Sequence, residues 1–122
     1  MDKATELVER YIDAWNERDE DVRRTRVAAL WSEPATYTDP LASVEGREAI
    51  SELIGAVQAQ APGHVFRLLD GIDAHHNVAR FQWELVPEQG GESVAIGFDV
   101  AVTDGDGRIG SVVGFLDKAP AV

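Results

Sequence analysis

The sequence predicts an α+β fold in which helices cover one face of a curved, barrel-like sheet. In the first half of the chain, apolar residues recur at the three- and four-residue spacing of amphipathic helices. In the second half, apolar and polar residues alternate with the period of two that is typical of β-strands. Helices followed by strands, rather than strands and helices in alternation, are the order of an α+β domain.

Length and composition favour one domain spanning residues 1–122. With 44% hydrophobic residues, a chain of this size buries a core large enough to enclose a small cavity. Cysteine is absent, which excludes disulfides and thiolate metal sites. The formal charge of −11 disfavours nucleic acid and anionic membranes as partners, because both need clustered cations. We therefore expect a small-molecule ligand.

The first twenty residues carry many charges and contain no unbroken apolar run. This composition predicts neither a secretory signal nor a membrane span. On this basis we expect a cytoplasmic protein.

A first helix over residues 3–17 is predicted by the spacing of its apolar side chains. These side chains form a single stripe that includes two aromatic residues: Leu7, Val8, Tyr11, Ile12 and Trp15. The stripe is expected to face the core.

Two further helices are predicted from their ends. Asp19 is a candidate N-cap, followed by an acidic first turn, for a helix that includes Trp31 and stops at Pro34. A third helix is predicted over residues 47–60, because a Pro-Gly pair marks its end and its apolar side chains fall on one face: Ile50, Leu53, Ile54 and Val57.

Five strands complete the expected set of elements. A short strand over residues 35–39 ends at Pro40. The other four alternate between turn sequences and cover residues 64–70, 78–87, 93–103 and 108–116. Because the segments between them are rich in Gly, Asp and Asn, these four strands should form an antiparallel meander.

The outer face of the sheet predicts a second subunit. In the strand over residues 93–103, apolar side chains on one side alternate with small side chains and one acid on the other: Phe98, Val100 and Val102 against Gly97, Asp99 and Ala101. The last strand is apolar on both sides, which indicates that both sheet faces are covered. Three helices can cover only one face. We therefore expect a homodimer formed through the outer face.

Three residues are candidates for chemistry. Asp39 precedes Pro40 where the sheet would open beneath its helices; a turn-initiating aspartate is the competing interpretation. Asp99 lies in mid-strand, where aspartate is disfavoured. Two interpretations are open, in which its side chain faces either the solvent or the helices. In the second case burial favours its protonated form. Tyr11 brings a phenol to the same region, although most such tyrosines belong to the core.

Together the three residues match the requirements for removing a proton next to a carbonyl. A carboxylate acts as base, and two donors stabilise the enolate that forms. Aromatic and small side chains are the expected pocket walls: Trp15, Tyr37, Phe66, Phe81, Trp83 and Ala101. Apolar walls increase the strength of each hydrogen bond inside them.

The stretches LVERYIDAWNERD, ATYTDPLASVEGREAI and IGFDVAVTDGDGRI contain these candidates. In them, and over nearly the whole chain, the sequence resembles the ketosteroid-isomerase branch of the nuclear-transport-factor-2-like, or SnoaL-like, superfamily. The resemblance implies a cone-shaped mixed sheet, with Tyr11 as the oxyanion-hole tyrosine, Asp39 as the base and Asp99 as the protonated acid. It also implies an isomerase or cyclase that needs no cofactor and acts on a small hydrophobic carbonyl compound.

Two other functions stay open at this stage. The same cavity can belong to a non-catalytic module that binds an apolar ligand or another protein. Alternatively, His75 or His76 would serve a dehydratase if their hairpin folded over the pocket, as in scytalone-dehydratase-like relatives; a solvated turn is the competing interpretation.

Two further kinds of site are disfavoured. The histidines lack metal-pair spacing, and Asp104-Gly-Asp-Gly107 has hairpin rather than calcium-loop character, so no metal is expected. Limonene-epoxide-hydrolase-like relatives need an Arg and an Asp two residues apart on one strand. Here Gln82 stands two residues after Arg80 in place of an Asp, so epoxide hydrolysis is disfavoured.

Overall fold

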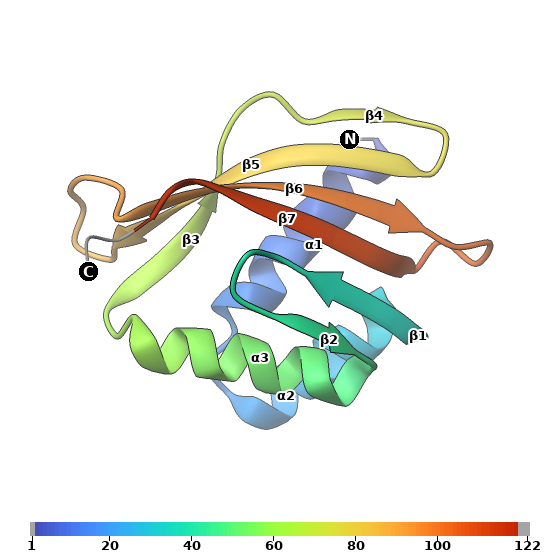
Figure 1. The fold of residues 1–122 in the computed structure, drawn as a ribbon, viewed down its shortest axis with the longest axis horizontal. Coiled ribbons are helices and arrows are strands. Elements are labelled where there is room, and N and C mark those ends of the chain that lie inside the picture. Colours follow the sequence, from blue (N-terminus) through green and yellow to red (C-terminus); the bar gives the residue numbers. More distant parts are fainter. Residues whose placement is uncertain (1, 120–122) are drawn as a thin grey trace.

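Seven strands form one open, mixed sheet with three helices against its inner face (Figure 1). The structure, a computed structural model, describes residues 2–119, so residues 1 and 120–122 of the predicted domain lie outside the described range. The elements are α1 (Lys3–Asn16), α2 (Glu20–Leu30), β1 (Trp31–Thr38), β2 (Ser43–Glu45), α3 (Arg47–Gln60), β3 (His64–Leu68), β4 (Asp73–His75), β5 (Val78–Pro87), β6 (Ala95–Thr103) and β7 (Ile109–Lys118).

The strand order explains why the sheet is mixed. It runs β2-β1-β7-β6-β5-β3, with β4 also paired to β5. Strand β1 is parallel to β7, and the other pairs are antiparallel. The predicted meander is therefore confirmed as β3, β5, β6 and β7. Since β2 and β3 end the order without pairing to each other, the sheet does not close into a barrel.

The start of β1 corrects the predicted second helix. That helix ends at Leu30, and Trp31 already has the extended backbone of β1 (φ −103°, ψ 148°). Pro34 lies inside the strand, in the stretch between Trp31 and Thr36 where the pairing with β7 shifts register. A proline fits there because no regular ladder bond requires its missing N–H.

Two strands, β2 and β4, have no counterpart in the prediction. Each is three residues long, which is too short to display a period of two. They form only through pairing, β2 with β1 and β4 with β5.

The helix ends follow from local capping. Asp19 caps α2 as predicted, since its Oδ1 accepts a hydrogen bond from the Val22 N–H at 3.0 Å. Asp2 caps α1 in the same way through the Thr5 N–H at 2.7 Å. Gly46 precedes α3 with a φ of 93°, a backbone conformation that favours glycine.

An aromatic cluster from both halves of the chain fills the space between α1 and the sheet. Tyr11 lies edge-on to Phe81, with ring centroids 5.2 Å apart, and Trp15 lies edge-on to Phe66 at 5.4 Å. Trp31 also packs on Tyr11. Edge-to-face pairs are worth about 1 kcal/mol each beyond the area that they bury. The cluster therefore holds the inner face of α1 in a defined position on the sheet.

The two faces of β6 differ as predicted. Gly97, Asp99 and Ala101 are buried against the helices, whereas the side chains that alternate with them are half-buried on the outer face. Among the described residues 2–119, no helix is both long and apolar enough to cross a membrane.

Candidate active site

Tyr11, Asp39 and Asp99 meet at one cavity of about 200 Å³ on the inner face of the sheet. They come from α1, the end of β1 and the middle of β6. Four of the predicted wall residues also line this cavity: Trp15, Tyr37, Phe66 and Trp83. The structure thus brings together side chains that are as far as 88 residues apart in the sequence.

Two predicted wall residues do not line this cavity. Phe81 pairs with Asp99 across the sheet, but the Tyr11 ring packs against it, and Phe81 is only 1% exposed. Ala101 lies one inward-facing position further along β6 and borders a separate groove beside the N-terminal half of α1. Position on the inner face was therefore a necessary condition for lining the cavity but not a sufficient one.

Several cavity residues were missed by sequence reasoning. They are mostly apolar and come from every layer of the fold: Ile12, Leu41, Val57, Gln60, Ala61, Leu85, Ala95 and Leu116. Ile12 shares the apolar stripe of Tyr11, which was an available signal. The others depend on how α3 and the β1–β2 turn pack over the sheet, and local patterns do not encode this packing.

Asp99 is a buried acid bonded to a tyrosine. Its Oδ2 accepts a hydrogen bond from the Tyr11 hydroxyl at 2.8 Å, and the residue is 2% exposed. Burial raises the pKa of Asp99 from 3.8 to about 6; hydrogen bonding with Tyr11 and Trp83 opposes this rise, and the nearby Asp39 charge adds to it. Of the two directions that the sequence left open for Asp99, the structure shows the one towards the helices.

Tyr11 keeps its proton under ordinary conditions. Its pKa lies well above the usual value of 10.0, first because of burial and then because of the charge of Asp99. A buried neutral phenol next to a carboxyl group is a hydrogen-bond donor rather than a base.

Asp39 is held by three hydrogen bonds at the cavity edge. Its Oδ1 accepts from the backbone N–H groups of Leu41 at 2.8 Å and Ala42 at 2.9 Å. Its Oδ2 accepts from the Tyr37 hydroxyl at 2.7 Å. Burial raises the pKa of Tyr37 above its ordinary value, so that this hydroxyl stays a donor. Asp39 therefore initiates a turn and also lines the cavity, and its two interpretations are compatible.

Two glycines leave space for the side chains of Asp99 and Trp83. Gly114 on β7 pairs with Asp99, and a Cβ at Gly114 would lie 2.6 Å from Asp99 Oδ1 and 3.5 Å from Asp39 Cβ. A Cβ at Gly97 would overlap the indole of Trp83. Glycine inside a strand is a known sign of close approach by another group, and this signal was available for Gly114 in the sequence.

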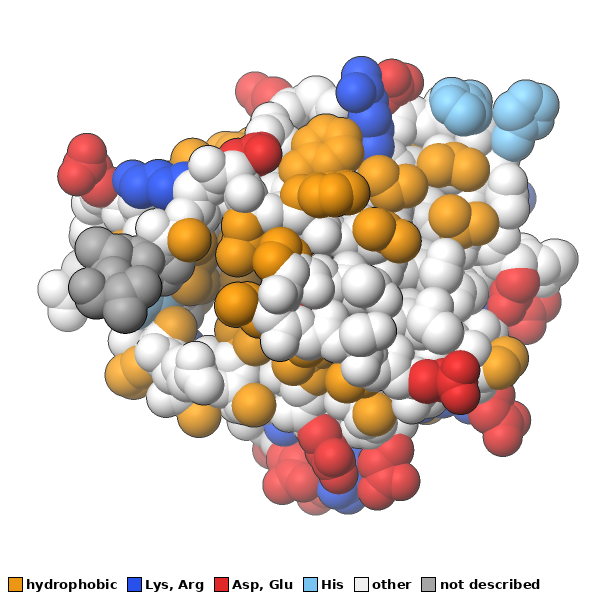
Figure 2. Space-filling view, in the orientation of Figure 1, with side chains coloured by type: hydrophobic (Ala, Val, Ile, Leu, Met, Phe, Trp, Pro, Cys, Tyr) orange, Lys and Arg blue, Asp and Glu red, His pale blue; other side chains and the backbone are white. Residues whose placement is uncertain are grey.

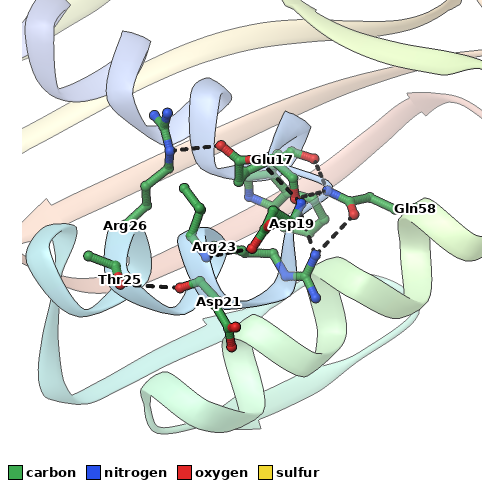
Figure 3. A network of polar contacts seen from close by, with 9 residues as sticks. Glu17, Asp19, Asp21, Arg23, Thr25, Arg26 and Gln58 are labelled. Carbon is green, nitrogen blue, oxygen red and sulfur yellow. Dashed lines mark hydrogen bonds and ion pairs between the residues drawn. The ribbon is translucent and has the colours of Figure 1, made fainter.

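A buried polar network holds the end of α1 on which Trp15 lies (Figure 3). The Gln58 Nε2 group on α3 donates to the backbone carbonyls of Trp15 at 2.9 Å and Glu17 at 2.8 Å. Arg23 on α2 donates in turn to Gln58 Oε1 and to the Glu17 carbonyl, each at 3.2 Å. All three helices thus meet at this point, which limits the movement of the cavity wall.

His75 and His76 lie apart from the cavity. Both are exposed, His75 at the end of β4 and His76 in the turn that leads to β5, and neither lines the cavity of Asp99. Within residues 2–119, no three His, Asp or Glu side chains are placed to hold a metal ion.

Comparison with known proteins assigns this chain to a family. The family model of the SnoaL-like domain matches residues 8–112, so the chain belongs to the SnoaL-like family, within the nuclear-transport-factor-2-like fold class. No curated protein sequence matches the chain.

Solved structures of the same fold include one close relative. A candidate isomerase of the SnoaL-like family from Agrobacterium tumefaciens is 40% identical, with a TM-score of 0.91 over 96% of this chain and 99% of that one. A candidate polyketide cyclase from Sinorhizobium meliloti is 21% identical, with a TM-score of 0.70 over 89% and 93%. An LEH-like epoxide hydrolase of M. tuberculosis is 19% identical, with a TM-score of 0.66 over 94% and 83%. The latter two share the fold alone.

The raised pKa of Asp99 predicts a pH-dependent contribution to stability. Ionising this buried acid in the folded state is unfavourable, so its contribution is complete below about pH 4 and is lost as the pH rises through about 6. A shift from 3.8 to about 6 corresponds to about 3 kcal/mol of unfolding free energy lost by pH 7.5. Urea unfolding of the wild type and Asp99→Asn between pH 4 and 7.5 measures this difference. Parallel pH curves for the two proteins would contradict it.

Replacing Gly114 by Ala should disturb Asp99 directly. The new methyl group would lie 2.6 Å from Asp99 Oδ1, so the carboxyl group must move and we expect a loss of about 1–3 kcal/mol in the free energy of unfolding. Gly110→Ala is a matched control on the same strand, because its nearest neighbour is at 3.7 Å. Urea unfolding should show a clearly larger loss for Gly114→Ala than for Gly110→Ala. Equal losses would show that Gly114 does not make room for the acid.

Proposed function

We propose that this protein is a cofactor-independent isomerase or cyclase that removes a proton next to a carbonyl group, in the manner of ketosteroid isomerase. The observation that carries the proposal is the convergence of Asp39, Tyr11 and Asp99 on one largely apolar cavity. Similarity to a candidate isomerase at 40% identity supports the same reaction class.

Asp39 is the proposed base. Its carboxylate would take the proton from the carbon next to the carbonyl, and the C–H electron pair would move onto the carbonyl oxygen to form an enolate. In an isomerase, Asp39 then returns the proton to another carbon of the same molecule. In a cyclase, the enolate carbon attacks a second carbonyl of the same molecule, whose oxygen takes up a proton.

Tyr11 and Asp99 are the proposed donors to the enolate oxygen. At present the Tyr11 hydroxyl donates to Asp99 Oδ2. Once Asp99 is protonated, its own O–H becomes a donor, and the Tyr11 proton is free to turn towards a ligand. Burial favours this protonated state, which makes a neutral acid available as a donor near pH 6.

The size of the cavity favours a small substrate. Its volume of about 200 Å³ equals the liquid volume of roughly seven water molecules. We therefore expect a compound of one or two rings with a carbonyl group, bound mainly through the aromatic walls. Leu41, which is 84% exposed, and Leu116 extend the apolar lining.

The alternatives differ from this proposal in what they require of the cavity. A dehydratase would need one of His75 and His76 at the cavity, and neither lines it. Arg80 is exposed and paired with Asp73 at 3.3 Å, away from the cavity residues, which disfavours epoxide-hydrolase chemistry. A non-catalytic binding module would use the same walls but would not need the acidity of Asp99.

We also propose that the outer sheet face binds a second copy of the chain. Phe115 and Val113 on β7 are 55% and 44% exposed, and they pair with Phe98 and Val100 on β6. Hydrophobic side chains gather over β5, β6 and β7 in the space-filling view (Figure 2). An identical patch on a second copy is self-complementary, as a two-fold dimer requires.

Changing Phe115 to Asp should convert the dimer to a monomer. The substitution places a charge in the middle of the apolar patch, where it has no partner. Val22→Asp is a matched control, because Val22 is 42% exposed but lies on α2. Sedimentation velocity at micromolar concentration distinguishes the two states. A monomeric wild type, or a dimeric Phe115→Asp variant, would contradict the proposed interface.

Proton abstraction can be assayed without knowledge of the natural substrate. A panel of one- and two-ring ketones is incubated in D₂O, and loss of the proton next to the carbonyl is followed by NMR. Asp39→Asn should lower the exchange rate roughly 10²- to 10⁴-fold, because the amide cannot accept the proton. Asp70→Asn, at an exposed position outside the cavity, should leave the rate unchanged.

Binding of phenols separates an enzyme from a binding module. A phenolate resembles the enolate, so an enzyme of this kind should bind it tightly and lose affinity in Asp99→Leu. If Asp39→Asn retained the exchange rate, Asp39 would not be the base. If the wild type exchanged no ketone and Asp99→Leu bound phenols unchanged, the cavity would be a simple apolar binding site.

A further inference from the structure

Among the described residues 2–119, none accepts a hydrogen bond from the buried indole N–H of Trp15. Trp15 is 7% exposed, and it lines the cavity. Its backbone carbonyl, by contrast, is satisfied by Gln58. Native proteins rarely leave a buried donor unpaired, and an unpaired donor at a cavity calls for a functional explanation.

Trp15 stands beside the proposed oxyanion donor. It follows Tyr11 by four residues on α1, so the two side chains are neighbours on one helix face, with ring centroids 6.3 Å apart. Burial raises the pKa of Tyr11, and the Trp15 side chain opposes this rise to a smaller extent, although its N–H forms no hydrogen bond of regular geometry. An N–H group acts in this direction when it favours negative charge on the phenol oxygen.

The Tyr11 oxygen has the capacity to accept this donor. A phenol hydroxyl donates one hydrogen bond and can accept others through its lone pairs. When its proton turns from Asp99 to a ligand oxyanion, negative charge builds up on the Tyr11 oxygen. Hydrogen bonds in such a chain strengthen one another in a buried site. The indole N–H of Trp15 would then donate a hydrogen bond to this oxygen.

We propose that Trp15 is a positioning residue that donates its indole N–H to the Tyr11 oxygen when Tyr11 binds the oxyanion of a ligand. The ligands that it favours are enolates and phenolates, rather than neutral apolar molecules of the same shape. This inference rests on the proposed function of the cavity, because it requires an oxyanion next to Tyr11.

Trp31 provides a matched control. It is fully buried, its Nε1 is also unpaired, and its ring lies 5.9 Å from that of Tyr11. It does not line the cavity, however. A change to Phe at either position removes an unpaired indole from the same aromatic cluster, and only the change at position 15 removes the donor at the cavity.

The test compares two ligands of similar shape, a nitrophenol bound as its anion and nitrobenzene, which has no hydroxyl. Trp15→Phe should weaken nitrophenolate binding about tenfold, as expected for one hydrogen bond in a charged network, and should change nitrobenzene binding less than about twofold. Trp31→Phe should leave both affinities within about twofold of the wild type. Equal losses for both ligands would indicate mere packing and would overturn the role of the N–H.

A second measurement needs no change at Trp15. The chain has three tryptophans, so a ¹⁵N-labelled sample gives three indole N–H signals, which Trp31→Phe and Trp83→Phe assign by elimination. Nitrophenolate should shift the Trp15 proton signal downfield, more than nitrobenzene does, and should leave Trp31 nearly unmoved. A Trp15 signal that responds alike to both ligands would overturn the inference. A wild type that binds no phenolate would instead contradict the proposed function.

Discussion

The hydrogen bond between Tyr11 and Asp99 is the interaction on which the rest of the site depends. It joins the first helix to the middle of β6 across 88 residues of sequence, inside the core. A buried carboxyl group is costly unless its oxygens are satisfied. Here the partner of Asp99 is the Tyr11 phenol, which keeps its proton because burial raises its pKa. One contact therefore anchors α1 on the sheet and joins two groups whose pKa values burial raises.

Holding an acid in the core requires space as well as partners. Glycine on the neighbouring strand leaves room for the Asp99 carboxyl, and a second glycine on β6 leaves room for the Trp83 indole beside it. The surrounding aromatic side chains exclude water and so strengthen each remaining polar interaction. The same features weaken the fold near neutral pH, where ionised Asp99 is destabilising. Burial therefore keeps the carboxylic acid at the cavity neutral up to about pH 6, and the fold loses stability above that pH.

The two carboxylates at this cavity have opposite environments. Asp39 lies half-buried at the edge, where two backbone N–H groups and the Tyr37 hydroxyl bind its oxygens. Asp99 lies in the interior, where its Oδ2 accepts a hydrogen bond from Tyr11 and burial raises its pKa. A pair of titratable groups whose surroundings differ in this way is suited to one base and one acid. Because one fold can host several chemistries, membership of the SnoaL-like family leaves the reaction to be decided by the residues of this site.

The sequence by itself determined most of the helices and long strands and offered Tyr11, Asp39 and Asp99 as candidates, because periodicity and capping act over a few residues. The tertiary structure decided which of its two possible directions the Asp99 side chain takes. Only the tertiary structure decided that Trp31 begins a strand, that β2 and β4 exist, and that Phe81 lies behind Tyr11 rather than in the cavity wall. The cavity lining, the contact of Gly114 with Asp99 and the unpaired N–H of Trp15 also required it. Each of these depends on which distant segments pack together, and no local pattern carries that information.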